Sequence, residues 1–174
     1  MTPVLINFCG KSGSGKSTLS KIIATQFQAV YLEMDTIDEL ISGTHHNMDN
    51  LYTILYGLAK ANLLIGNIVV LDAVNHSKTT REGLYHVVAE TRCDYLNIEI
   101  ICSDNTQRRN RLEERGEKLG FDWWNVDEIM SEPWDDWDEQ AKRITVDTAD
   151  KSIDECIAVI ANAIHSWSFI CKQP

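Results

Sequence analysis

The sequence predicts an α/β protein in which a parallel sheet is covered by helices on both faces. Short apolar runs alternate with amphipathic stretches along most of the 174 residues, an order typical of strand–helix–strand units. The first apolar run leads directly into a glycine-rich turn and then into a helical pattern. No repeat, low-complexity stretch or linker divides the chain. We therefore expect a single domain over residues 1–174.

The apolar runs are short and bounded by polar or glycine-containing stretches, which predicts strands at 4–9, 29–33, 67–72, 95–102 and 143–147. Apolar residues at helical spacing predict helices at 16–27, 36–42, 48–65, 79–91, 104–118 and 152–168. At the start of the last helix, Ser152 and Glu155 have the spacing of a capping box.

Segment 117–140 does not follow this alternation. It is rich in carboxylates and holds four of the five tryptophans: Trp123, Trp124, Trp134 and Trp137. A connection of this length inside a compact domain is usually functional, so we expect a lid-like element. The indoles could stack on an aromatic ligand, but packing of the lid onto the body of the domain is favoured.

The turn after the first strand reads Gly-Lys-Ser-Gly-Ser-Gly-Lys-Ser from Gly10 to Ser17 and matches the phosphate-binding loop pattern. Glycines let successive backbone amides point inward, and the following helix adds positive charge at its N-terminus. Lys16 is then expected to reach the β- and γ-phosphates of a nucleoside triphosphate, and the Ser17 hydroxyl to hold magnesium. The expected nucleotide-binding set is Gly10, Gly13, Ser14, Gly15, Lys16, Ser17 and Thr18.

Carboxylates close two of the predicted strands, where ligands of open parallel sheets bind. The second strand runs into Glu33-Met34-Asp35, and strand alternation would aim Glu33 and Asp35 to the same side. Asp35 is expected to accept the proton of an attacking hydroxyl; the alternative is an N-cap of helix 36–42. Asp72, which closes the third strand, is expected to hold magnesium directly or through water, and the alternative is a simple turn residue.

The helix predicted at 104–118 is rich in arginine. Spacings of three, four and three place four basic residues on one helical stripe: Arg108, Arg111, Arg115 and Lys118. Such a stripe could stabilise the charge of a phosphoryl group in transfer. Arg109 instead lies over Glu113 and is expected to be structural. The alternative for the stripe is a solvated helix with salt bridges, because Glu114 neighbours Arg111 and Lys118.

The charge and cysteine content of the chain limit the partners and cofactors that we expect. Sixteen basic against 26 acidic residues give a net charge of −10, which opposes binding to a long nucleic acid. Five scattered cysteines without a Cys-x-x-Cys pair predict buried thiols, with neither a zinc site nor a disulfide framework. Neither a signal-peptide pattern nor an apolar run of membrane-spanning length occurs. We expect a cytoplasmic monomer or homodimer that does not bind membranes.

Together these elements resemble the small P-loop kinases of the adenylate-kinase-like group, within it the gluconate, shikimate and polynucleotide kinase branch. The resemblance covers about residues 4–115 and rests on the 10–17 loop, Glu33-x-Asp35, Asp72-x-x-Asn75 with Arg81 beyond, and Arg111-Leu-x-x-Arg115. It implies a three-layer P-loop NTPase fold, with a five-stranded parallel sheet of order 2-3-1-4-5 and a lid over ATP. It implies ATP and Mg as cofactors.

The resemblance also implies roles for particular regions. Asp35 would contact the accepting hydroxyl, and Asn75 and Arg81 would be acceptor-side residues. Residues 147–150 would lie near the adenine. The acceptor-binding region would be 36–66 and the lid region 108–140, although the family supplies no assignment for 117–140 and often has aspartate where this chain has Glu33.

Three functions are compatible with these motifs. The first is an ATP- and magnesium-dependent kinase that phosphorylates a hydroxyl of a small metabolite, nucleoside or nucleotide. The second is a 5′-hydroxyl nucleic-acid kinase, suggested by Asp72-x-x-Asn75 and Arg81 but opposed by the negative charge. The third is a nucleotide-hydrolysing switch or interaction protein; the chain has no Asn-Lys-x-Asp guanine motif. The motifs favour the first.

Overall fold

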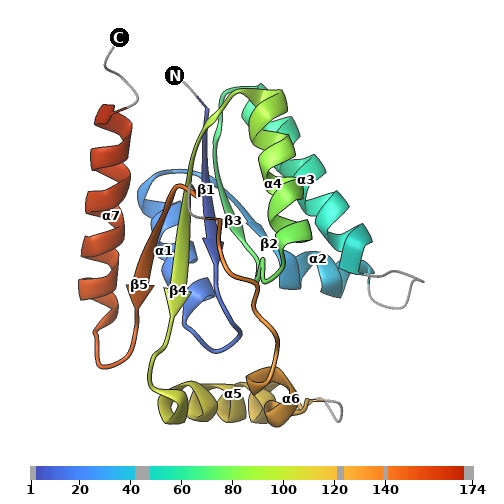
Figure 1. Ribbon diagram of the computed structural model, residues 1–174, viewed down its shortest axis with the longest axis vertical. Helices are drawn as coiled ribbons and strands as arrows, with labels where there is room; N and C mark the ends of the chain where they lie inside the picture. The colour runs from blue at the N-terminus through green and yellow to red at the C-terminus, as the bar shows by residue number, and fades with distance from the viewer. Residues whose placement is uncertain (1–2, 42–47, 121–123, 139–140, 171–174) are drawn as a thin grey trace.

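In the computed structural model, which describes residues 3–41, 48–120, 124–138 and 141–170, the core is a five-stranded parallel sheet. Its order is β2-β3-β1-β4-β5, as predicted (Figure 1). The strands lie within one residue of the predicted bounds at each end: β1 (Val4–Cys9), β2 (Val30–Glu33), β3 (Ile68–Asp72), β4 (Asp94–Ile101) and β5 (Arg143–Asp147).

Six helices fall within two residues of their predicted bounds: α1 (Lys16–Gln26), α2 (Met34–Ile41), α3 (Met48–Leu64), α4 (Lys78–Thr91), α5 (Asn105–Leu119) and α7 (Ile153–Ile170). A short helix that the sequence reading missed, α6 (Val126–Met130), lies inside the tryptophan-rich segment. The Asn125 side chain caps it by accepting hydrogen bonds from two backbone amides. None of the described helices is long and apolar enough to cross a membrane.

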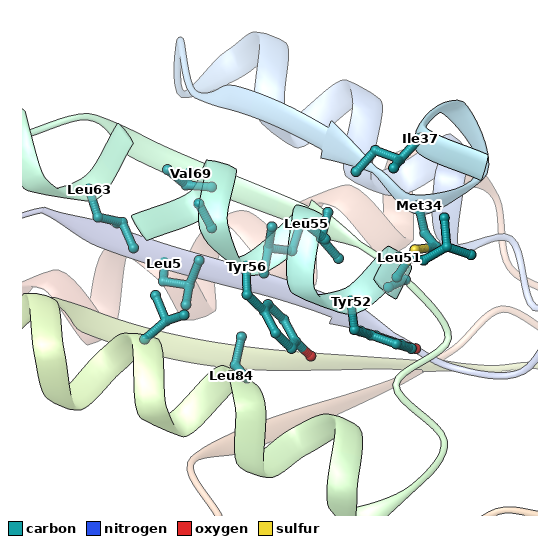
Figure 2. Packing of buried hydrophobic residues seen from close by; sticks show 14 of the residues in the cluster. Leu5, Met34, Ile37, Leu51, Tyr52, Leu55, Tyr56, Leu63, Val69 and Leu84 are labelled. Atoms are coloured by element: carbon teal, nitrogen blue, oxygen red, sulfur yellow. The ribbon is translucent and has the colours of Figure 1, made fainter. Parts of the chain in front are cut away.

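The sheet is buried on both faces, which explains why its strands read as apolar runs. On β1, Leu5 packs into the cluster beneath α3 and α4, whereas Ile6 and Phe8 pack into the cluster on the opposite face with α1 and α7. Figure 2 shows the first cluster, where Leu55 and Leu63 of α3 meet Leu5 and other sheet residues.

Over β4, the face that carries α3 and α4 elsewhere is covered by residues 131–138, which we call the return segment. Trp137 donates a hydrogen bond to Glu99 of β4 over 2.9 Å, and the Arg81 guanidinium stacks 4.5 Å from the Trp137 ring centroid. Arg81 also donates to the backbone carbonyls of Asp135 and Asp136. These contacts fasten the return segment to the sheet and to α4.

A ladder of amide side chains crosses the same face. The Tyr56 hydroxyl donates to Asn75 over 2.9 Å, Asn75 donates to Asn7 over 2.9 Å, and Asn7 donates to Asn97 over 2.8 Å. Asn97 then donates to the Lys142 carbonyl over 3.1 Å. Because the three asparagines are fully buried, this satisfied network fixes the loop after β3 relative to β1 and β4.

Candidate functional site

The Gly10–Ser17 turn joins β1 to α1 (Figure 1) and is held against the end of β4 and against Arg108 and Leu112 of α5. A Cβ at Gly10 would lie 2.1 Å from the Ile100 carbonyl oxygen, and one at Gly13 would lie 2.9 Å from Leu112 Cγ. Both glycines also have positive φ angles, +141° and +80°, which other residues rarely adopt. Glycine is therefore required at both positions by close approach as well as by conformation.

Two cavities meet beside this turn. The larger, about 580 Å³, extends along α1 to the loop after β5. The smaller, about 330 Å³, lies between the turn, α2, α3 and the loop after β3. Five residues line both cavities: Lys16, Ser17, Glu33, Asp35 and Arg115.

Most of the predicted nucleotide-binding residues lie at the larger cavity. Gly13, Gly15, Lys16, Ser17 and Thr18 line it. Gly10 and Ser14 do not: Gly10 is pressed against β4. Ser14 is buried, and its carbonyl accepts a 2.8 Å hydrogen bond from Thr148. These two residues fix the turn through contacts with β4 and with the loop after β5.

Lys16 faces a buried carboxylate. Its Nζ lies 3.6 Å from Asp72 Oδ1, while Asp72 Oδ2 accepts hydrogen bonds from Ser20 and Tyr31 over 3.0 and 2.8 Å. Burial, and then the charge of Asp72, raise the pKa of Tyr31, so this phenol stays a hydrogen-bond donor. Asp72 is the last residue of β3 and only 2 % exposed, so the alternative reading as a turn residue is wrong.

Asp35 lies at both cavities, but it is carried by a helix and not by the end of a strand. β2 ends at Glu33 and α2 begins at Met34, so strand alternation does not orient Asp35, and Asp35 lies inside the first turn rather than at the N-cap. Its Oδ2 is 2.5 Å from Arg115 Nη2. Glu33 has other partners: its carboxylate pairs with Lys21 at 2.9 Å and accepts a hydrogen bond from Thr36 over 2.8 Å.

The predicted arginine stripe is divided by the structure. Arg111 and Arg115 line the larger cavity, and Arg111 donates to the Thr148 hydroxyl over 2.9 Å. Arg108 is only 5 % exposed and lines neither cavity. It donates to the backbone carbonyls of Ser12 and Ile129 over 2.8 and 3.2 Å, so it supports the turn instead of lining the larger cavity. Burial lowers the pKa of the Arg108 guanidinium.

Arg109 behaves as predicted. It lies 3.9 Å from Glu113 and also pairs with Asp127 of α6 over 2.7 Å, away from both cavities. Lys118, the last member of the stripe, also lines neither cavity. Of the four residues of the predicted stripe, only Arg111 and Arg115 therefore line the larger cavity.

The acceptor-side positions implied for Asn75 and Arg81 need correction. Both are buried and neither is among the described residues that line the two cavities above. Asn75 is used by the amide ladder, and Arg81 holds the return segment. Their printed side-chain hydrogen bonds are thus made within the fold.

Sequence reasoning missed several residues of the two cavities. Lys21, Thr148 and Lys151 line the larger one, and His76 and Glu132 line the smaller one. Thr148 falls in the loop expected near the adenine, but the others belong to no motif. The expected packing onto the body of the domain is confirmed for Trp137, which contacts Glu99 of β4 and Arg81 of α4. Trp124 instead packs within the lid region, where its indole donates to the Leu112 carbonyl of α5 over 3.0 Å, and Trp123 lies outside the described residues.

Asp147, at the end of β5, ties the loop after β4 to the loop after β5, and the latter contributes to the larger cavity. Its Oδ1 accepts hydrogen bonds from the backbone amides of Ser103 and Ala149, both over 3.0 Å. Burial acts to raise the pKa of Asp147, but these hydrogen bonds outweigh it and lower the pKa below the ordinary value of 3.8. The charged carboxylate therefore stabilises the folded state.

We expect Asp147→Asn to lower the free energy of unfolding by up to about 1 kcal/mol at neutral pH. Because the folded-state pKa is depressed, this contribution is complete above pH 3.8 and is lost as the pH falls through the lower folded-state value. The gap between wild type and variant in urea unfolding should therefore narrow toward about pH 3. The control Glu117→Gln, at an exposed position of α5, should show no such convergence. A gap independent of pH would contradict this assignment.

The sheet order, the glycine-rich turn with Lys16 and the cavity beside it define a P-loop protein of the kinase-like group. The chain belongs to the family described as AAA domain, whose model matches residues 5–151. No curated protein matches the chain significantly.

Three similar solved structures have the same fold at low sequence identity. APS kinase CysC of Mycobacterium tuberculosis, in complex with AMPPNP and APS, is 19% identical with a TM-score of 0.71, over 94% of this chain and 98% of that one. A gluconokinase of Sinorhizobium meliloti is 18% identical with a TM-score of 0.65, over 97% of both chains. Kti12 of Chaetomium thermophilum, in complex with ADP-AlF3, is 20% identical with a TM-score of 0.62, over 92% and 98%.

Proposed function

We propose that this protein is an ATP- and Mg-dependent kinase that transfers the γ-phosphoryl group to a hydroxyl of a small molecule. One observation carries the proposal: two cavities meet at a shared wall that contains a phosphate-loop lysine, a carboxylate and an arginine. A kinase must hold two substrates in line with only the transferred group between them. The similar structures with AMPPNP and with ADP-AlF3 support nucleotide binding at the larger cavity.

Each residue of the shared wall has a role in this proposal. The turn amides and Lys16 bind the β- and γ-phosphates, and Arg111 and Arg115 neutralise the charge that develops during transfer. Asp35 accepts the proton of the attacking hydroxyl. Because Arg115 is paired with Asp35 here, a bound triphosphate would compete for this arginine and leave the carboxylate available to the hydroxyl.

Ser17 and Asp72 are the residues that would hold Mg²⁺. Both line the smaller cavity, and Ser17 lines both cavities. The described residues contain no group of three or more His, Cys, Asp or Glu side chains able to hold a metal ion. This sparse donor set fits magnesium, which is usually bound through one or two protein ligands, nucleotide phosphates and water. When bound, the ion would neutralise phosphate charge.

Two regions complete the proposal. Residues 36–66 supply part of the smaller cavity through Asp38, Met48, Leu51 and Tyr52 and form the acceptor-binding region. Residues 108–140 form the lid region, with α5 and α6 lying beyond the strand ends (Figure 1). Closure of the lid would keep water from replacing the acceptor.

The test is ADP release from magnesium ATP across a panel of hydroxyl compounds. We expect a severalfold rise with the correct acceptor, accompanied by a phosphorylated product detected by mass spectrometry. Release that stays flat across metabolites and nucleosides would favour the nucleotide-hydrolysing switch. A rise only with 5′-hydroxyl oligonucleotides would favour the nucleic-acid kinase.

Arginine substitutions on α5 test the assignment of its two faces. Arg115→Ala should lower the turnover number by roughly 10²-fold or more, because the γ-phosphate loses a cation that would stabilise the charge developing during transfer. Arg109→Ala, the matched control six residues earlier on α5, should leave turnover within about twofold because its partners are exposed carboxylates. Single-turnover phosphoryl transfer provides the measurement. Equal effects of the two substitutions would contradict the division of the helix.

A further inference from the structure

The two cavities have opposite charge outside their shared wall. Among the described residues, the larger cavity adds three cations and no carboxylate: Lys21, Arg111 and Lys151. The smaller cavity adds three carboxylates and neither lysine nor arginine: Asp38, Asp72 and Glu132. Among the described residues of this lining, His76 is the one imidazole. One cavity is therefore built for an anion and the other opposes one.

The shared wall does not reverse this difference. Its two cations are already engaged, Lys16 with Asp72 at 3.6 Å and Arg115 with Asp35. In the proposed kinase both cations turn to the phosphates of the nucleotide. Any Mg²⁺ held by Asp72 would offset the charge of that carboxylate, so with nucleotide bound the charge preference depends mainly on Asp38 and Glu132.

Much of the remaining lining of the smaller cavity is apolar. Met48, Leu51, Tyr52 and Pro133 contribute to its lining, which offers a surface for a carbon skeleton. At about 330 Å³ the space lies at the lower end of the range for small-molecule sites. A compact alcohol fits it better than a polymer end.

We infer that the phosphoryl acceptor is a small alcohol without net negative charge, and that a cationic amino alcohol binds better than a carboxylate-bearing alcohol of the same skeleton. That the ligand is a phosphoryl acceptor rests on the proposed function. The charge preference of the smaller cavity does not depend on it. The physical reason is repulsion: an anion would bring its charge beside Asp38, Asp72 and Glu132.

The charge of the cavity can be measured without knowing the acceptor. Met48, which lines the smaller cavity, is 55 % exposed, and Leu64, at the other end of α3, is 62 % exposed. Cysteine is introduced at either position, and its modification by cationic trimethylammonioethyl or anionic sulfonatoethyl methanethiosulfonate is followed by mass spectrometry of that site. In each reaction the thiolate forms a disulfide with the reagent and methanesulfinate leaves.

We expect the ratio of cationic to anionic modification rates to be about tenfold higher for Met48→Cys than for Leu64→Cys. Adding Asp38→Asn and Glu132→Gln to Met48→Cys should remove most of this excess, whereas adding Glu90→Gln, a carboxylate paired with Lys60 on the surface, should not. Equal ratios at both positions, or faster modification of Met48→Cys by the anionic reagent, would overturn the inference.

The second arm uses activity. Glucosamine, glucose and glucuronate share a sugar ring and differ in charge, and choline and glycolate extend the comparison; each is tested with magnesium ATP. ADP release that is highest with an anionic member would overturn the inference. Release with none of them counts against the proposed function for these skeletons, while the cysteine ratios still decide the charge preference. Release favouring neutral or cationic members supports both.

Discussion

Lys16→Ala is expected to lower phosphoryl transfer by about three orders of magnitude or more, the largest effect of any single substitution in this chain. Lys16 is one of only two cations that line both cavities among the described residues. It is therefore the group best placed to follow the γ-phosphoryl from one substrate to the other. Single-turnover transfer from labelled ATP measures the loss, and circular dichroism checks that the variant folds.

Lys21→Ala is the matched control for this prediction. Lys21 is on the same helix and lines only the larger cavity, where it is paired with Glu33. Its exposed ion pair contributes little, so its loss should change transfer by less than about tenfold. If the two lysine variants lost activity equally, the role of Lys16 would be that of general positive charge instead of direct contact with the moving group.

Asp35→Asn is expected to lower the turnover number by roughly 10²- to 10⁴-fold while leaving nucleotide affinity within a few fold, because the amide cannot accept the hydroxyl proton. The change keeps the size of the side chain and its position in the first turn of α2. Steady-state kinetics give turnover, and titration with a non-hydrolysable nucleotide gives affinity. Parallel losses of turnover and affinity would remove Asp35 as the base.

Glu33→Gln is the control, since Glu33 also lines both cavities but is held by Lys21 and Thr36. We expect it to lower turnover far less than Asp35→Asn. Arg115→Ala adds a second check, because it frees Asp35 from its ion pair and yet should still slow transfer. A rise in turnover in Arg115→Ala would indicate that the pair is inhibitory.

The sheet and six helices could be predicted because both faces of the sheet are buried and the intervening helices are amphipathic, so local pattern and tertiary environment agree. The exception is α6, whose five residues are too few for a periodic signal. The helix begins at the Asn125 cap, and its C-terminal turn is held by a hydrogen bond from Arg108 to the Ile129 carbonyl. The second of these contacts is tertiary and has no local signal in the sequence.

The part of the site that a motif determines through backbone geometry could be predicted. The partners of long side chains could not. The Gly10–Ser17 turn follows from its glycines. Arg108 and Arg111 are three residues apart on one helix, yet one reaches buried carbonyls and the other a cavity. Helical spacing cannot separate these outcomes. Asn75 was misassigned because a buried amide ladder has no pattern in a linear sequence.

The contacts of the return segment limit where proteins with this arrangement can gain or lose residues. It has no helix or strand, so a sequence comparison would treat it as a loop that tolerates gaps. Its backbone and indole are nevertheless fastened to Arg81 and Glu99, as a core element would be. Additions and deletions should therefore accumulate before it, between α5 and Ser131, and a change of even one residue within 131–138 would shift Trp137 away from its partner strand.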